Sequence, residues 1–229
     1  MRHGQDMTAN DIAPPRPRTV RPQTVRYDGA QNRLRVLDAA LDVFSQVGYE
    51  GASTRAIAAA AGIEQGHLAY YFPNKMALWR QVIETFAQQA EQRLAHHIAL
   101  SEGAPACAIA RAALPVLLRG FAENPRLTRL MLQEMSVSSD RSTWLAENFA
   151  QPVWRLLAPV FSQMRADGYL GGTAPEIAYF SLIGAALITF GNRALIAQFS
   201  GIDPADEHWV EEAIAHMLAP VFTSTGPAK

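Results

Sequence analysis

Gln65, His67 and Tyr70 are the side chains whose types and spacing best suit recognition chemistry in this chain. They place an amide, an imidazole and a phenol on one side of a short predicted helix. Polar and aromatic groups of this kind can form hydrogen bonds and apolar contacts with the base edges in the major groove of DNA. Recognition requires a support that holds these groups in place, and the neighbouring elements must provide it.

The support begins with a predicted helix that ends near residue 48. Leu34, Leu37, Leu41 and Phe44 fall at helical spacing and give this helix one apolar face. Gly48 follows at the position where a left-handed C-terminal cap is expected. The pattern predicts an amphipathic helix that packs against the elements after it.

A second, shorter helix is predicted over residues 54–61. Either Ser53 or Thr54 offers a hydroxyl group that can cap its N-terminus. The consecutive alanines at residues 58–61 favour helix and let a neighbouring helix approach closely. Gly62 then ends the helix after about two turns.

The third helix, over residues 64–71, must be held by packing, since isolated helices shorter than about 12 residues are marginal in water. Leu68 and Phe72 are expected to supply the buried contacts, and the opposite face carries the polar and aromatic groups. Asn74 is a natural cap for a fourth helix that begins at Lys75. This layout predicts a helix-turn-helix DNA-binding unit.

These residues resemble the signature of the tetracycline-repressor (TetR) family of transcriptional regulators. The matching segments are Thr54 to Ala61, Gly62-Ile63 and Gly66-His67-Leu68-Ala69-Tyr70-Tyr71-Phe72-Pro73-Asn74-Lys75. The resemblance is specific over residues 33–86 and implies a homodimer of all-helical subunits. It also implies an N-terminal DNA-binding domain and a larger C-terminal domain for dimerisation and ligand sensing.

Phosphate contacts are implied by the resemblance at four positions. Thr54 and Arg55 would bind phosphate through a helix N-terminus and a guanidinium group. Tyr71 and Lys75 correspond to positions that clamp phosphate in the family. A packing role is the alternative for Tyr71.

Base reading, by the same resemblance, falls to Gln65 for adenine, and to His67 and Tyr70 for base edges or thymine methyl groups. Two positions depart from the family pattern. Ala69 stands where an aromatic residue is common, and Glu64 stands where a small hydroxyl residue is common. The alternatives are a surface position without a duty for His67 and a favourable charge at a helix start for Glu64.

The chain before this unit is rich in proline and arginine, with no acidic residue over positions 14–27. This composition predicts a disordered basic arm over residues 1–30, which either contacts the DNA backbone or minor groove or is a solvated leader. It lacks the continuous apolar core of a secretory signal. The remaining domains are predicted at 31–78 (DNA binding), 79–223 (ligand sensing and dimerisation) and 224–229 (a flexible tail).

The net charge and the cysteine content limit the possible functions further. Its 229 residues carry a net charge of −1, so no field of the whole protein attracts nucleic acid, and the basic residues gather in the arm and first helix. The single cysteine, Cys107, excludes an intramolecular disulfide and a cysteine-rich metal motif. We expect it to be a small buried apolar residue, with a redox-sensing thiol as the alternative.

Helical patterning continues to the C-terminus, which predicts an all-α fold. Helices are expected over residues 75–99, 106–123, 125–137 and 143–166, and no period-two strand pattern occurs. The prolines Pro115, Pro152 and Pro159 should kink or divide their helices.

Three sites have the pattern of a helix cap in this region. Asn124 and Asp203 each precede a proline, which suits the first helical position. Thr173 and Glu176 have the spacing of a capping box. We therefore expect helices to begin just after each of these residues.

Residues 177–191 form the most hydrophobic stretch and contain no charged residue. The stretch is shorter than the roughly 18 apolar residues that a membrane span needs, so we expect no membrane and a helix buried on both sides. With an apolar stripe on the last helix, it predicts a four-helix interface between two subunits. The interface residues predicted are Ile183, Leu187, Ile214, Met217, Leu218 and Val221.

Aromatic and methionine side chains on the central helices predict a cavity for a small, largely apolar effector. The candidates are Phe121, Met131, Met135, Trp144, Phe149, Trp154 and Phe180. Core packing is the alternative for each of them. No cofactor is expected.

An enzyme is not predicted, because the sequence has no nucleophile elbow and no glycine-rich phosphate loop. His208 and His216 could hold a surface metal ion, but an exposed charged face is the preferred interpretation. The predicted function is a cytoplasmic, dimeric repressor that binds a palindromic operator and is released by a small molecule. Two alternatives stay open: an activator of the same fold, and a helical adapter that binds proteins.

Overall fold

The computed structural model describes residues 29–224, except for the side chains of residues 29, 30, 86 and 87. Within this range every regular element is a helix and no strand occurs, which confirms the predicted all-α fold. The arm predicted at residues 1–30 and the tail predicted at 224–229 lie almost wholly outside the described residues.

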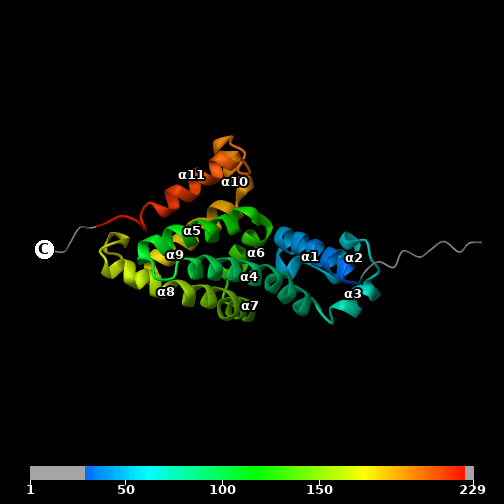
Figure 1. The fold of residues 1–229 in the computed structure, drawn as a ribbon. Coiled ribbons are helices and arrows are strands. Elements are labelled where there is room, and N and C mark those ends of the chain that lie inside the picture. Colours follow the sequence, from blue (N-terminus) through cyan, green and yellow to red (C-terminus); the bar gives the residue numbers. More distant parts are fainter. Residues whose placement is uncertain (1–28, 225–229) are drawn as a thin grey trace, which may run out of the picture.

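Three helices form the N-terminal unit: α1 (Gly29–Gly51), α2 (Thr54–Ala61) and α3 (Gln65–Tyr71) (Figure 1). The apolar stripe of α1 packs on α2, and Leu37, Leu41 and Phe44 are buried as the periodicity predicts. Leu34 is an exception, with 59% of its surface exposed.

Local side-chain chemistry sets the ends of these helices. The Ser53 hydroxyl, rather than that of Thr54, accepts a hydrogen bond from the amide of Ala56 at 3.1 Å and caps α2. Gly62 ends α2 in the left-handed conformation. Gly48 has φ 70° and ψ 175°, a region open essentially only to glycine, so the positive φ was predicted but the ψ differs from that of a left-handed cap.

Eight further α-helices form the larger part of the described chain. They are α4 (Lys75–Leu100), α5 (Ala106–Glu123), α6 (Pro125–Met135), α7 (Asp140–Leu145), α8 (Gln151–Ala166), α9 (Pro175–Gly191), α10 (Arg193–Ser200) and α11 (Glu207–Leu218). Helix α5 is central and packs against α4, α8, α9 and α11. Helix α4 runs from the N-terminal unit into this bundle, and α6 lies between α1 and α9 (Figure 1).

Helix α6 begins at Pro125 directly after Asn124, as predicted, but none of the three predicted residues caps its helix through its side chain. The Asn124 side chain donates to the carbonyl of Gly120 at 3.1 Å and closes α5 instead of capping α6. The residue before α9 is Ala174, not Thr173, and it has no side-chain cap. Short polar side chains bond to whichever backbone group lies nearest, so a cap pattern alone is ambiguous.

The start of α11 shows the same effect. The Asp203 carboxylate accepts from the amide of Ala205 at 2.9 Å and forms a turn. Asp206 then caps α11 by accepting from the amide of Trp209 at 3.0 Å. The helix therefore begins later than the aspartate–proline pair predicts.

The helix predicted over residues 143–166 is divided, as its prolines suggest. A π-helical turn, Ala146–Ala150, separates α7 from α8. Pro152 is the second residue of α8 and has no N–H to donate to the preceding turn, which coincides with the change from π-helix to α-helix. Pro115 and Pro159 lie inside α5 and α8, which continue through them.

Helix α9 is apolar all round, but the rest of the protomer covers only part of it. Tyr179 and Phe190 are buried, whereas Ile177, Phe180 and Ile188 are 60%, 63% and 55% exposed. Among the described residues no single helix meets the length and hydropathy of a membrane span. Only the bent pair of α9 and α10, at 75°, passes that test jointly.

Candidate DNA-reading surface and effector cavity

Helix α3 turns its polar face to solvent and is held from behind by two apolar side chains. Leu68 is 1% exposed and Phe72 is 5% exposed, so both anchor the helix as predicted. Gln65, His67 and Tyr70 are exposed on the outer side. Tyr70 has 85% of its surface exposed and hardly packs against the core. This face is therefore open to solvent and accessible to a partner.

The candidate phosphate-binding residues lie on both sides of this face. Thr54 and Arg55 occupy the first turn of α2, where amide groups and the helix dipole favour an anion. The Arg55 guanidinium is exposed and has no partner among the described residues. Tyr71 is half-buried, with its ring edge-on to that of Tyr70 at 5.4 Å between centroids.

Lys75, assigned to phosphate by the family resemblance, is engaged inside the protein. Its ammonium group donates to the carbonyl oxygens of Tyr49 at 2.8 Å and Ala52 at 2.9 Å. It also lies 4.3 Å from the centre of the Tyr49 ring. Since two of its three N–H groups are used, the main effect of Lys75 is to join the start of α4 to the chain that leaves α1.

Tyr49 is the centre of a charged and aromatic cluster that periodicity does not reveal. Its ring stacks on Phe44 at 5.9 Å and meets Trp79 edge-on at 6.3 Å. The guanidinium of Arg141, from α7, lies 4.2 Å from the ring centre, which places a second cation beside that of Lys75. Burial raises the pKa of Tyr49, against an opposing effect of Arg141, so the phenol stays neutral.

Arg141 also bridges two carboxylates from different parts of the chain. It donates to Glu50 at 2.9 Å and to Glu134 at 2.8 Å, and the Glu134 residue is only 5% exposed. Burial lowers the pKa of Arg141, but hydrogen bonds and charges from Glu134 and Glu50 outweigh it, so the net pKa is raised. The bridge ties α6 and α7 to the end of α1.

Helix α6 makes further contacts with α1. Arg126 pairs with Asp38 at 2.6 Å, and the Gln133 amide donates to the carbonyl of Ser45 at 3.3 Å. On its other side, α6 supplies apolar residues to a cavity in the bundle. A shift of α6 would therefore change both its contacts with α1 and the shape of the cavity.

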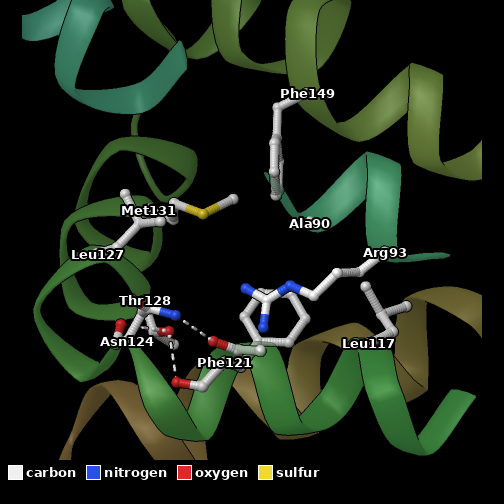
Figure 2. A pocket seen from close by; sticks show the side chains of 10 residues that line it. Ala90, Arg93, Leu117, Phe121, Asn124, Leu127, Thr128, Met131 and Phe149 are labelled. Atoms are coloured by element: carbon white, nitrogen blue, oxygen red, sulfur yellow. Dashed lines mark hydrogen bonds between the residues drawn. The ribbon is translucent and has the colours of Figure 1, made fainter. Parts of the chain in front are cut away.

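A partly open cavity lies between α4, α5, α6 and the π-helical turn, with about 430 Å³ of empty space when the open solvent at its mouth is counted (Figure 2). Its walls are formed by Ala90, Arg93, Leu117, Gly120, Phe121, Asn124, Leu127, Thr128, Met131 and Phe149. A small adjoining compartment shares several of these walls and adds Met135, Ala150, Val153, Tyr179 and Ile183. Burial raises the pKa of Tyr179 to about 12, so this end of the cavity carries no charge at neutral pH.

The structure brings together some of the predicted cavity residues but not all. Four of them line the two compartments, namely Phe121, Met131, Met135 and Phe149. Trp144 instead meets Trp79 edge-on at 5.4 Å, near the Tyr49 cluster.

Two further candidates also lie elsewhere. Trp154 lies one layer behind the cavity, with its ring 4.9 Å from that of Tyr179. Phe180 is exposed on α9 and does not line either compartment. Hydrophobic periodicity marks apolar faces, and it cannot tell a core residue from a cavity wall or from an uncovered surface.

The residues predicted for the dimer interface lie mainly inside the protomer. Ile183, Leu187, Ile214, Leu218 and Val221 are all buried by the chain itself, and Met217 is half-buried. They face α5 and each other, because α9 and α11 pack within one subunit. The apolar surface left uncovered on α9 is a different row.

That uncovered row consists of Ile177, Phe180 and Ile188, with half-buried Gly184 between them. These positions recur on one side of a helix with a period near 3.6 residues. Small side chains at the centre of such a row allow a second helix to approach closely. This row, and not the six predicted residues, is the apolar surface of α9 that the chain itself leaves exposed.

Comparison with known proteins identifies both parts of the chain. The sequence profile for bacterial regulatory proteins of the tetR family matches residues 36–82. The profile for the tetracyclin repressor-like C-terminal domain matches residues 104–224, more than half of the chain.

Individual relatives agree with these profiles. The HTH-type transcriptional regulator RutR of Escherichia coli strain K12 is 35% identical over 100 residues, which are 44% of this chain and 46% of RutR. The HTH-type transcriptional repressor KstR of Mycolicibacterium smegmatis is 30% identical over 138 residues, 60% of this chain and 65% of KstR. The chain thus spans about half to two thirds of the length of these relatives.

A solved structure shares the fold along most of the chain. The transcriptional regulator FadR of Bacillus subtilis, determined in complex with stearoyl-CoA, superimposes with a TM-score of 0.61 at 17% identity. The match covers 82% of this chain and 98% of FadR.

Proposed function

The chain belongs to the tetracycline-repressor family of bacterial regulatory proteins, and we propose that it is a homodimeric repressor that binds a palindromic operator and is released by a small molecule. Its partners are then double-stranded DNA, a second copy of the chain and a largely apolar effector. Since chromosomal DNA is one partner, its place of action is the cytoplasm. The relatives RutR and KstR are named as regulators of transcription, not as enzymes.

In this proposal α3 enters the major groove. Gln65, His67 and Tyr70 then meet base edges, and their exposure supports this role. Arg55, with the first-turn amides of α2, binds the flanking phosphate. Lys75 supports DNA binding indirectly and does not itself contact phosphate, because its ammonium group joins α4 to the N-terminal unit.

The proposed dimer forms through the uncovered row on α9. Ile177, Phe180 and Ile188 would each lose exposed apolar surface against the same row of a second subunit. Association about a two-fold axis makes such a contact self-complementary. It would also place two recognition helices about 34 Å apart, or a multiple of that, to read the two halves of a palindrome.

The single observation that carries the regulatory part of the proposal is that α4 and α6 each contact both functional regions. Helix α4 begins at Lys75, which is tied to the N-terminal unit, and supplies Ala90 and Arg93 to the cavity. Helix α6 lines the cavity through Met131 and pairs with α1 through Arg126. An effector that binds one arrangement of these helices more tightly shifts the population away from the DNA-binding arrangement.

Repression is favoured over activation by the relative KstR, which is named a repressor and is 30% identical. A bound dimer would then block transcription until the effector arrives. An activator would use the same DNA surface, so the two are separated by whether transcription from the operator rises or falls when the gene for this protein is deleted.

The proposal is tested by selecting bound sequences from a random DNA pool with the full chain. We expect a palindrome to be enriched and its affinity to fall steeply with salt, because phosphate contacts release counterions. Arg55→Gln should lower the slope of log affinity against log salt by about two, because each subunit of the dimer loses one phosphate contact. Arg155→Gln, which removes an exposed arginine from α8, is the matched control and should leave the slope unchanged.

Two outcomes would overturn the assignment. Enrichment without a palindrome would remove the dimeric operator model. Absence of any DNA binding by an intact, folded chain would favour the alternative of a helical adapter, whose apolar protein contacts depend little on salt.

A further inference from the structure

The cavity is apolar except at its mouth. Of the described residues that line its two compartments, Arg93 alone has a charged side chain. No described carboxylate belongs to the lining, although Glu123 pairs with Arg93 at the mouth, and Tyr179 at the far end stays neutral because burial raises its pKa to about 12. A bound molecule therefore meets one positive charge at the mouth and apolar walls beyond it.

The other polar groups of the wall are already bonded to the backbone. The Thr128 hydroxyl lies 2.9 Å from the carbonyl oxygen of Phe121 and 3.0 Å from that of Asn124. The Asn124 amide donates to the carbonyl of Gly120 at 3.1 Å. Breaking these bonds to hold a ligand would leave carbonyl groups unsatisfied, so the interior selects an apolar group.

Arg93 is the one polar side chain of the wall that can be released at little cost. Its guanidinium donates to the Glu123 carboxylate at 3.2 Å and, through Nε, to the carbonyl of Gln89 within the same helix at 3.4 Å, and the Arg93 and Glu123 side chains are 47% and 48% exposed. Such a pair on the surface contributes little to stability. Figure 2 shows the Arg93 side chain extending toward Phe121, so an anion bound to its guanidinium would lie next to an apolar wall of the cavity.

We propose that the effector is an amphiphilic anion: an apolar chain that fills the cavity, ended by a carboxylate that binds Arg93. This assignment rests on the proposed function and names the chemical class of its effector. The incoming carboxylate replaces Glu123 as the partner of the guanidinium. A neutral molecule lacks this contact, and a cation is repelled by it.

The exchange also links the ligand to the helices that reach the DNA-binding unit. Arg93 belongs to α4, and Glu123 is the last residue of α5. When the ligand takes over the guanidinium, the ion pair between α4 and α5 at this point is broken. The charged head and the apolar chain therefore act on the same helix, α4.

The test uses three probes that share a ten-carbon chain: decanoate, decanol and decyltrimethylammonium, each titrated into the full-length chain by calorimetry. We expect decanoate to bind at least about tenfold more tightly than decanol, the factor given by about 1.4 kcal/mol. Decyltrimethylammonium should bind most weakly.

Two variants give opposite expected results. Arg93→Gln should abolish the preference for decanoate over decanol and leave decanol binding unchanged. Glu123→Gln removes the competing carboxylate and should tighten decanoate binding, whereas a purely structural ion pair would make both variants weaken it. Arg155→Gln, on exposed α8 surface, is the control for loss of a positive charge and should behave as the unaltered protein.

Equal affinity for decanoate and decanol, or no binding of any probe, would overturn the proposal. So would an Arg93→Gln variant that retains the preference. Operator binding is measured on the same samples and separates this inference from the function on which it rests. If the protein binds DNA but does not prefer decanoate, only the proposed class of effector is wrong. If it prefers decanoate but does not bind DNA, only the proposed role as a regulator is wrong.

Discussion

The reading face of α3 and the wall of the cavity use their side chains in opposite ways. Tyr70 on the reading face is 85% exposed, and the residues that hold the helix, Leu68 and Phe72, are separate from those that would touch DNA. In the cavity, Phe121 and Met131 are 7% and 2% exposed, so the side chains that would touch a ligand also form the core.

The difference shows where function and folding can be separated. On α3 a recognition side chain can be changed without removing packing. In the cavity each change alters both the space for the ligand and the stability of the bundle. The cluster around Tyr49 lies between these extremes. Its charged groups are partly buried, and they join the N-terminal unit to the helical bundle that holds the cavity.

The largest expected effect comes from the residue that holds the reading face in place. Leu68→Ala should lower the free energy of unfolding by about 2–5 kcal/mol, since it removes a fully buried side chain. Tyr70→Ala should change it by less than about 0.5 kcal/mol. Urea denaturation followed by circular dichroism measures both. Equal losses in the two variants would mean that the reading face is part of the core, contrary to the comparison.

A second prediction asks whether the junction behaves like the core or like the surface. Arg141→Met leaves the buried Glu134 carboxylate without its guanidinium and should cost about 2–3 kcal/mol of stability. Arg155→Met removes an exposed arginine and should cost less than about 0.5 kcal/mol. If the two variants unfold at the same urea concentration, the bridge contributes nothing and the junction behaves like the surface.

The uncovered row on α9 provides a third test, in which an exposed apolar residue should matter for assembly and not for folding. Phe180→Glu would bury a charge between subunits, and should weaken dimerisation at least about 30-fold, equivalent to about 2 kcal/mol. Sedimentation measures the monomer–dimer equilibrium. The helical content should not change, and Arg165→Glu on exposed α8 surface is the control. An unaltered dimer would place the interface elsewhere.

The smallest expected effect is on base discrimination. Gln65→Ala should reduce affinity for the selected operator by about 1 kcal/mol or more and relax the preference at one base pair in each half of the palindrome. The salt dependence should not change, because no charge is removed. Gln92→Ala, at an exposed position on α4, is the matched control and should bind as the unaltered protein does. A loss that is the same for every DNA sequence would mean that Gln65 contacts the backbone.

Local features of the fold were predictable where a residue acts on its immediate neighbours. The stop at Gly62 and the cap at Asn74 follow from one left-handed residue and from one side chain that accepts from the amide of Ala77 at 2.8 Å. The caps assigned to Asn124 and Asp203 failed for a related reason. Asn124 bonds backward to the carbonyl of Gly120 and Asp203 accepts from the amide of Ala205, and the sequence does not indicate which backbone group such a side chain will bond.

The candidate site was predictable only where it depends on a single element of the chain. The exposed face of α3 could be predicted because a single helix and its own period place Gln65, His67 and Tyr70 together. The cavity could not, because α4, α5 and α6 must meet before Arg93 and Met131 share a wall. Apolar residues such as Phe180 and Ile183 look alike in sequence, although one is exposed and the other buried.

The amino-acid sequence by itself determined the helices and the helix-turn-helix unit, because helical period and turn residues act over a few positions. Tertiary structure alone decided which apolar faces are covered, which lie open for a second subunit and where the cavity forms. It also joined Arg141 to Glu50, which is 91 residues away in the chain. The physical reason is that burial and charge pairing depend on distances in space, and these are set only when the helices pack.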